Sequence, residues 1–401
     1  MQSVPHTSLE TAAPAVRLAA CECLTPFGGT NETLAALLRG ESALRATHVL
    51  GADGGDLVPL ALLPDRALNE ESPPAWLARL RQFLAPVTGP MWGTARRPVI
   101  VTSSNFGVGS LYAYHHAQTA ADANHAPYGP IHKSVASLRD ACEWGPNITI
   151  FSHACVSAHL GLVHAARLLA LGGGDANDSG AGRAPVDEVL VVSYDFLSPF
   201  VAGGFHSLKI LNTEFPAPYM DRATGSIGLG DGAGFAVLAR DRGAHRIAAQ
   251  SLHNEMHHFT ANRPDGAGFA SVFAPIAKAA AGMRVWIKGH GTGTLEAGRL
   301  ESSAVAAAFP GAPLVSWKGA LGHTLGSCGL VELAIAAASM RNPASDGQPL
   351  RAPGTVGTSA PVFTSQVATS PFDTAAFDGV VCASNAFGGA HAALLLLKDG
   401  K

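Results

Sequence analysis

A cysteine at residue 155 occupies a position where a side chain could act as a nucleophile. Cys155 follows the apolar run Ile148–Phe151 and precedes a helix-like stretch, which predicts a strand-to-helix turn. The first turn of a helix leaves backbone N–H groups free, and their partial positive charge is expected to lower the pKa of a neighbouring thiol. A buried, inert thiol fits the same position, and this segment alone leaves both interpretations open.

Two histidines occupy glycine-rich turns after further strand-like runs. WIKGHGTGT, residues 286–294, places His290 directly after one run, and SWKGALGHTLGSCGLVE, residues 316–332, places His323 five residues after Lys318. Flanking glycines leave an imidazole accessible and let the backbone approach a ligand closely. Together with Cys155, these histidines predict covalent catalysis assisted by acid–base groups.

The elements that must position these side chains alternate between strands and helices. Short apolar runs predict buried strands at 98–101, 148–151, 189–192, 285–287, 314–316, 380–382 and 394–397, and helix-like stretches lie at 157–171, 301–309 and 330–340. Continuous apolar strands alternating with helices predict α/β layers with sheets covered on both faces.

The length and composition predict a large buried interior divided between two halves. The chain has 401 residues, 47% of them hydrophobic and only 14% charged. Such a length suggests two domains or two fused halves. A weak break near 241–245 divides the chain into an N-terminal half, 1–243, which carries Cys155, and a C-terminal half, 244–401, which carries both histidine motifs.

Several functional classes are disfavoured by composition and spacing. The net charge is −3, with no runs of Lys or Arg, so no nucleic-acid partner is expected. The sequence contains no uninterrupted run of about 18 apolar residues, so no membrane span is expected. Six cysteines without a C-x-x-C pair favour a reduced, cytoplasmic setting. HNEMHH, residues 253–258, and GLGDGAG, residues 228–234, depart from zinc and dinucleotide motifs, so neither a metal nor a cofactor site is expected.

The same motifs resemble those of the β-ketoacyl synthases, the condensing enzymes of the thiolase fold. HACVSAHLGLVHAARLLALG resembles the nucleophile segment, GHGTGT the first histidine motif, KGALGHTLGSCGLVE the Lys…Gly-His motif and SNAFGGAHAALLLL the C-terminal Phe-Gly-Gly segment. Their order and spacing agree with the family from about residue 15 to 398. The positions that the resemblance marks as functional are Cys155, His290, Glu301, Lys318, His323, Glu332, Phe387, Gly388 and Gly389.

The resemblance implies a layered α-β-α-β-α thiolase-like fold built from two similar halves, and a decarboxylative Claisen condensation. Cys155 would accept an acyl chain from a carrier-protein thioester. His290 and His323 would bind a malonyl thioester and promote its decarboxylation. The backbone N–H groups of Cys155 and Phe387 would form the oxyanion hole, with Gly388 and Gly389 completing that turn. Lys318 and Glu332 would order the histidines.

The family also implies the partners of the chain. Its substrates are carried on the phosphopantetheine of an acyl carrier protein, and no dissociable cofactor is required. Members are usually dimers, so we expect a homodimer, with a heterodimer containing a ketosynthase-like subunit as the alternative.

Some positions depart from the family pattern, and they indicate a divergent branch in pigment, aryl-polyene or polyketide metabolism. These positions are His153, Asp231, Gly298, Asn385, Ala386 and Ala390–His391. Three other functions stay open: an acyltransferase that does not decarboxylate, a non-catalytic partner subunit of a heterodimer, and a cysteine hydrolase. The second histidine motif disfavours the hydrolase, and retention of Cys155 disfavours the non-catalytic subunit.

Overall fold

The structure is a computed structural model, and it describes residues 16–51, 54–68, 73–115, 129–171, 185–221, 225–258, 260–341, 350–361, 363 and 366–399. Its centre is a ten-stranded sheet in the order β11-β10-β14-β15-β9-β1-β8-β6-β4-β5. The bounds of these strands are β1 (Val16–Leu24), β4 (Val99–Thr102), β5 (Ile148–Phe151), β6 (Glu188–Asp195), β8 (Gly232–Ala239), β9 (His245–Asn254), β10 (Val285–Lys288), β11 (Leu314–Val315), β14 (Gly379–Ala386) and β15 (Ala390–Lys398).

The two halves of this sheet repeat one topology. Strands β1, β8, β6, β4 and β5 lead away from the junction on one side, and β9, β15, β14, β10 and β11 on the other. The parallel and antiparallel pairings match strand for strand in both halves. The halves meet where residues 16–18 of β1 pair with residues 245–247 of β9. A division at 243/244 stays a prediction, and this repeat supports it.

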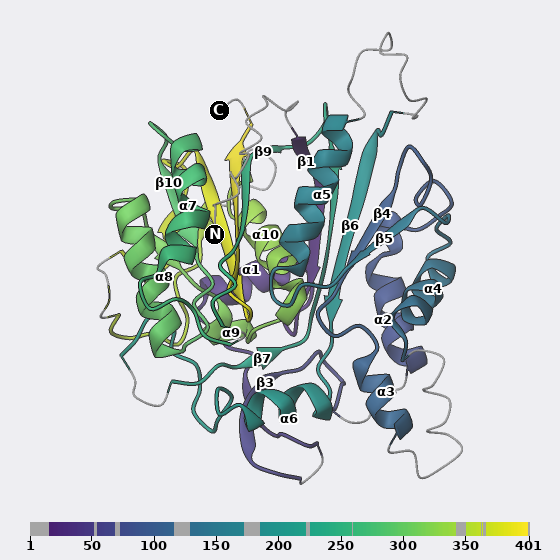
Figure 1. The fold of residues 1–401 in the computed structure, drawn as a ribbon, viewed down its shortest axis with the longest axis horizontal. Coiled ribbons are helices and arrows are strands. Elements are labelled where there is room, and N and C mark those ends of the chain that lie inside the picture. Colours follow the sequence, from purple (N-terminus) through teal and green to yellow (C-terminus); the bar gives the residue numbers. More distant parts are fainter. Residues whose placement is uncertain are drawn as a thin grey trace, which may run out of the picture.

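Helices separate the two halves of the sheet and cover their outer faces (Figure 1). The central layer contains α5 (Ser157–Leu171) and α10 (Cys328–Ala338), whose apolar side chains pack against both halves. Helices α2 (Pro73–Phe83) and α4 (Ile131–Ala141) cover the N-terminal half. Helices α7 (Ala267–Ala279) and α8 (Leu295–Ala308) cover the C-terminal half. This is the α-β-α-β-α order that the sequence predicts.

Small residues allow the central helices to lie close to the strands. A Cβ atom on Gly161 of α5 would lie 2.9 Å from Thr102 Cγ2 and 3.0 Å from Val191 Cγ1. Such distances are too short for an added carbon, so only glycine fits this contact without displacing the helix from β4 and β6.

The segment Ala154–Leu171 is long and apolar enough to cross a membrane by length and composition. His159, His164 and Arg167 interrupt it, so the search for an uninterrupted run missed it. Its side chains Leu162 and Leu169 are fully buried in the protein core. Its place between the two halves of the sheet therefore accounts for its composition.

A smaller group of elements lies at one end of the layers, below the candidate active site that is described in the next section. The three-stranded sheet β2-β3-β7 lies there with α6, α3 and α9 (Figure 1). The remaining described elements are α1 (Thr30–Leu38), β2 (Arg45–His48), β3 (Leu57–Ala61), the 3₁₀ turns η1 (Ala85–Val87) and η3 (Leu325–Ser327), α3 (Val108–His115), α6 (Pro199–Ser207), β7 (Leu229–Gly230), α9 (Lys318–Leu321), β12 (Arg351–Ala352) and β13 (Phe372–Asp373).

Candidate active site

Cys155 lies in the turn between β5 and α5, as the sequence predicts. Ala154, the residue before it, has a positive φ of 45°, which is uncommon for a residue with a side chain. Ser157 stabilises the turn, because its Oγ accepts a hydrogen bond from His153 N at 2.8 Å and donates one to Ala154 O at 2.6 Å. The strained backbone turns Cys155 off the end of the strand and towards the histidines.

His323 contacts the sulfur of Cys155 directly. Its Nε2 lies 2.9 Å from Cys155 Sγ, a distance suited to proton transfer. Its backbone N–H donates to Gly228 O at 2.7 Å, which holds the histidine turn against the segment leading into β7. The ring of His290 faces the ring of His323 edge-on, with ring centroids 4.9 Å apart. Three reactive side chains that are far apart in the sequence therefore meet in one place.

The loop that carries His290 is held by Glu301 of α8. Glu301 accepts hydrogen bonds from His290 N at 2.5 Å and from Gly291 N at 2.8 Å. Tyr219 OH donates to the same carboxylate at 3.0 Å. A buried carboxylate with three donors fixes the backbone on which His290 sits.

Lys318 and Glu332 lie behind the histidines and do not line the cavities at Cys155. Lys318 Nζ donates to Glu332 Oε1 at 2.6 Å, and both side chains are almost completely buried. A second lysine, Lys288, contacts the other carboxylate oxygen of Glu332. No sequence motif marks Lys288, although it stands two residues before His290 at the end of an apolar strand.

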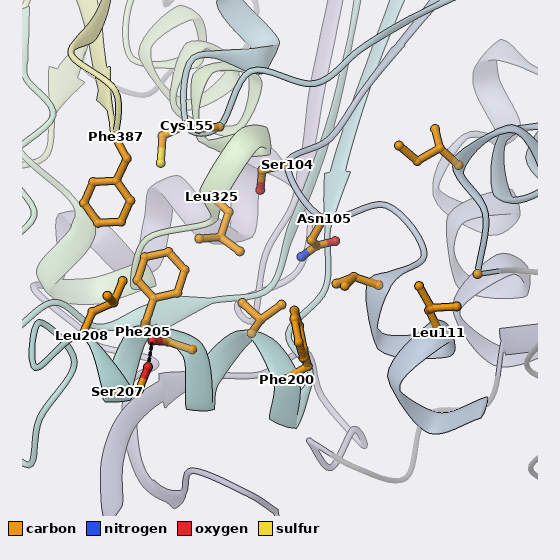
Figure 2. A pocket seen from close by; sticks show the side chains of 16 residues that line it. Ser104, Asn105, Leu111, Cys155, Phe200, Phe205, Ser207, Leu208, Leu325 and Phe387 are labelled. Carbon is orange, nitrogen blue, oxygen red and sulfur yellow. Dashed lines mark hydrogen bonds between the residues drawn. The ribbon is translucent and has the colours of Figure 1, made fainter. Parts of the chain in front are cut away.

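Phe387 lies in the turn between β14 and β15, beside Cys155 (Figure 2). Gly388 and Gly389 follow it with φ of 84° and 71°, a backbone conformation that favours glycine. The Phe387 ring is 39% exposed and stacks on Phe205 of α6, with ring centroids 6.0 Å apart. Phe387 borders both cavities that reach Cys155, as does Phe205.

The two cavities differ in size and chemistry. The larger, about 730 Å³, is almost entirely apolar; Figure 2 shows Cys155 and Phe387 towards one end and Leu111 towards the other. Among its lining residues only Ser104, Asn105 and Ser207 have polar side chains. The smaller, about 220 Å³, is the one that His290 and His323 line, together with Thr292, Thr294, Glu296 and Asn385 among others.

Asp195, at the end of β6, joins the wall of the large cavity to the start of α10. Its carboxylate accepts hydrogen bonds from Ser103 Oγ at 2.7 Å, Asn105 N at 3.0 Å and Ser327 N at 3.0 Å. Asp195 is not predicted from the sequence, because a single Asp at the end of a strand carries no distinguishing motif.

Burial dominates the protonation of the reactive groups. It raises the pKa of the Cys155 thiol well above its usual range, with the Cys328 thiol adding to the shift and Lys318 opposing it. The expectation of a lowered pKa at the helix N-terminus is therefore wrong, because desolvation of the thiolate outweighs nearby positive charge. Burial, followed by the positive charge of Lys318, holds the pKa of His290 and of His323 well below the usual value. At neutral pH the site contains a thiol and two neutral imidazoles.

The residues that depart from the family pattern have different surroundings. Asp231 is completely buried, forms an ion pair with Arg66 at 2.7 Å and accepts a hydrogen bond from Leu197 N, so its role is to join segments of the fold. Asn385 bonds to His391 Nδ1 at 3.0 Å. The rest are an exposed His153, Gly298 on α8 and Ala386 at the small cavity.

Comparison with known proteins gives similarity at three levels. Residues 245–345 match the family model "Beta-ketoacyl synthase, C-terminal domain". The chain is 28% identical over 277 residues to a 3-oxoacyl-[acyl-carrier-protein] synthase 2 of Rhizobium meliloti, covering 63% of this chain and 61% of the relative. It is 28% identical to the tetracenomycin polyketide synthase ketoacyl synthase alpha subunit of Streptomyces glaucescens, covering 49% and 48%. The chain thus spans 48% to 61% of the length of these curated relatives.

Solved structures match over nearly the whole chain. A β-ketoacyl synthase from Burkholderia phymatum STM815 superposes with a TM-score of 0.75 at 20% identity, covering 96% of this chain and 99% of that one. The ketosynthase ApeO in complex with its chain length factor ApeC from Xenorhabdus doucetiae matches with a TM-score of 0.73 at 21% identity, covering 99% and 100%.

The layered sheet and the full-length structural matches define a thiolase-like ketosynthase fold. Residues 245–345 are similar to the C-terminal domain of the β-ketoacyl synthases, and the curated relatives that the chain resembles are ketosynthases.

Proposed function

We propose that this chain is a β-ketoacyl synthase, which condenses an acyl group held on Cys155 with a malonyl thioester by decarboxylation. The observation that carries the proposal is the 2.9 Å contact between Cys155 Sγ and His323 Nε2, beside a second neutral histidine, His290. A nucleophile with one base suffices for acyl transfer alone. A second imidazole in the same cavity supplies a group for the negative charge of an enolate.

In the first half-reaction, Cys155 loses its proton to His323 and its sulfur attacks the acyl thioester carbonyl. The bond from that carbonyl carbon to the departing pantetheine sulfur breaks, and this thiolate leaves with the proton that His323 returns. Because burial raises the pKa of Cys155, the thiol needs a base within hydrogen-bond distance, and His323 supplies one.

In the second half-reaction, the malonyl carboxylate leaves as CO2 and its bonding electrons form an enolate on the thioester. The N–H group of His290 stabilises the enolate oxygen. The enolate carbon attacks the acyl–Cys155 carbonyl, a carbon–carbon bond forms, and Cys155 leaves as a thiolate that takes up one proton from the solvent. The backbone N–H groups of Cys155 and Phe387 stabilise the tetrahedral oxyanion.

The lining of the large cavity supports a mainly hydrocarbon acyl chain. Phe200, Val201, Phe205, Leu208 and Leu325 line it, and its few polar side chains leave the keto groups of a poly-β-ketone without partners. A saturated or polyene chain buries apolar surface there without that cost. The branch of metabolism that we propose is therefore fatty-acid or polyene synthesis rather than aromatic polyketide synthesis.

An acyl carrier protein and a second subunit are the proposed partners. β5 forms one edge of the sheet, and its Ile150 is 37% exposed, which favours pairing with another chain. A second copy of this chain is our proposal, within a reducing compartment such as the cytoplasm. A heterodimer is the alternative, since three of the similar solved structures are described as a ketosynthase with a chain length factor.

The test is intact-protein mass spectrometry. The chain is incubated with acyl-carrier-protein thioesters of alkyl, polyene and β-keto chains, and then with malonyl carrier protein. We expect an acyl adduct on Cys155, strongest with alkyl or polyene donors, that disappears as CO2 and a β-ketoacyl product form. An adduct that survives malonyl carrier protein but leaves to an alcohol or amine identifies an acyltransferase. Absence of any adduct, with Cys155→Ala as the blank, identifies a non-catalytic subunit.

A further inference from the structure

Lys288 is a fully buried lysine directly behind the reactive centre. It ends β10, two residues before His290, and its side chain is 0% exposed. Its ammonium group contacts Glu332 Oε2, while Lys318 Nζ donates to Glu332 Oε1 at 2.6 Å. One carboxylate on α10 is thus held from both sides by lysines from β10 and α9.

This cluster contains more positive than negative charge. With both lysines protonated, Lys288, Lys318 and Glu332 carry a net charge of +1 in a buried region. Burial lowers the pKa of Lys288, and the buried carboxylate of Glu301 faces Lys318 from α8. Burying a charge without full compensation is costly, and a neutral residue that fills the same volume often stabilises the fold as well or better. The Lys318–Glu332 pair alone would stabilise the fold without a second buried cation. We therefore expect Lys288 to have a role besides stability.

The histidines are the groups on which that charge acts. After burial, the positive charges of Lys318 and Lys288 lower the pKa of His323, and the same lysines with His323 lower that of His290. A protonated His323 is unable to accept the proton of Cys155. The other titratable groups facing the cluster or the histidines include His159 of α5, Glu301 of α8, Cys328 of α10, Cys382 of β14, His391 of β15 and Tyr219.

We propose that Lys288 is a positioning residue of the reaction: it holds the second oxygen of Glu332 and adds a buried positive charge that keeps His290 and His323 neutral and available at Cys155. The inference rests on the proposed function, since it assigns the histidines a role at the thiol. Lys288 acts through its neighbours, because it lines neither cavity that reaches Cys155.

The test compares Lys288→Met, which removes the charge and keeps an unbranched side chain, with Lys288→Arg, which keeps the charge. Lys133→Met, at an exposed position on α4, is the control. The rate at which iodoacetamide alkylates Cys155 is measured from pH 4.5 to 9 on the full chain, as the modified Cys155 peptide. The fall in alkylation rate at low pH, the acidic limb of the profile, reports the protonation of His323. If the role of Lys288 were purely structural, replacing it would leave this fall at the same pH.

In the wild-type chain we expect the acidic limb well below the ordinary histidine value of about 6.5. Lys288→Met should move it up by about 1 pH unit, so that alkylation below the limb slows about tenfold. Lys288→Arg and Lys133→Met should keep the wild-type profile. Superimposable profiles for Lys288→Met and wild type overturn the inference, as does an equal shift for Met and Arg.

Two further outcomes keep the inference separable from folding and from the proposed function. If Lys288→Met does not fold, a wild-type limb near pH 6.5 overturns the inference, and a low limb retained by Lys288→Arg supports it. If the wild type is alkylated with the expected profile but takes no acyl group from any carrier protein, the proposed function fails and the role of Lys288 stands. If it condenses normally while all profiles coincide, only the role of Lys288 fails.

Discussion

His290 and His323 have similar sequence surroundings but different positions at the sulfur. His323 Nε2 contacts Cys155 Sγ at 2.9 Å. His290 contacts the ring of His323, and in the part of the chain described it has no hydrogen bond to Cys155. The geometry therefore assigns the proton of the thiol to His323. In the proposed reaction, His290 is left to act on the malonyl group.

The two alanine variants should fail at different steps. His323→Ala should slow acylation of Cys155 by about 10²–10⁴-fold, because a positioned base contributes about that much. His290→Ala should keep acylation close to the wild-type rate and stall CO2 release from malonyl carrier protein. Rapid quenching followed by intact mass gives the acylation rate, and trapped CO2 gives the second step.

His132→Ala, at an exposed position on α4, is the control for both variants. Wild-type acylation by His323→Ala would contradict the assignment of the base. Equal loss of both steps in the two variants would show that the histidines act as one unit.

At the residue scale, sequence motifs predict which groups meet but not their protonation. Cys155, His290 and His323 stand in distinctive turns, and the structure brings them together. The pKa of Cys155 depends on how many atoms of other segments surround the sulfur, which a local motif does not contain. Lys288 was missed for a similar reason: VWIK reads as a strand with a polar end, and its partner Glu332 is 44 positions away in the sequence.

The β14–β15 hairpin places Phe387, and a side-chain network anchors it. His391 of β15 binds Asn385 Oδ1 of β14 through Nδ1 at 3.0 Å, and its Nε2 lies 3.6 Å from Glu255 Oε1. The backbone N–H of Glu255 donates to Gly389 O at 3.0 Å. His391 and Glu255 therefore hold the two ends of the Phe387 turn.

We expect His391→Ala to loosen this turn and slow acylation of Cys155. Its loss leaves Asn385 Oδ1 without the hydrogen bond from His391, while Glu255 Oε1 keeps the one from Arg263 N. An unsatisfied buried acceptor costs about 1–3 kcal/mol in the free energy of unfolding. Amide exchange of residues 385–389 should rise, and acylation should slow about tenfold if the Phe387 N–H is part of the oxyanion hole.

His391→Gln, which keeps a hydrogen-bonding group, should recover part of both effects, and the exposed His132→Ala should change neither. Exchange of residues 385–389 at the wild-type rate in His391→Ala would show that the glycine turn holds its own shape.

At the element scale, the strands that the sequence predicts contain β-branched residues, except for the leucine run at 394–397. All seven predicted strands lie in the main sheet. The three that were missed, β1, β8 and β9, read VRLAACECL, GAGFAVLA and HRIAAQSLHN. Alanine and glycine have little intrinsic preference for strands, so these segments form strands because neighbours pair with them on both sides. They include the two strands that join the halves, which is why the junction was only a weak break in the sequence.

For the molecule as a whole, the layered packing buries histidines that the unfolded chain exposes. His159 of α5 and His245 of β9 are 3% and 5% exposed, and burial lowers the pKa of each to about 4. His290 and His323 are shifted in the same direction. All four are neutral in the folded protein at pH 6, where an unfolded histidine, with a pKa of about 6.5, is largely protonated.

The fold should therefore lose stability on acidification below about pH 7. Between pH 6.5 and 4 the unfolded chain binds more protons at these positions than the folded chain, so the free energy of unfolding rises with pH and falls as pH is lowered. For one histidine whose pKa falls from about 6.5 to about 4, the loss between pH 7 and 5 is about 2 kcal/mol.

His159→Leu removes one such group and places an apolar side chain in its position between α5 and α10. Urea unfolding at pH 7 and pH 5 should show a loss smaller by about 2 kcal/mol in this variant than in the wild type. The difference between the two pH values is the measured quantity, so any repacking that shifts stability equally at both cancels. The exposed His132→Leu should show the full wild-type loss, and an unchanged loss in His159→Leu would place the acid sensitivity in groups other than the buried histidines.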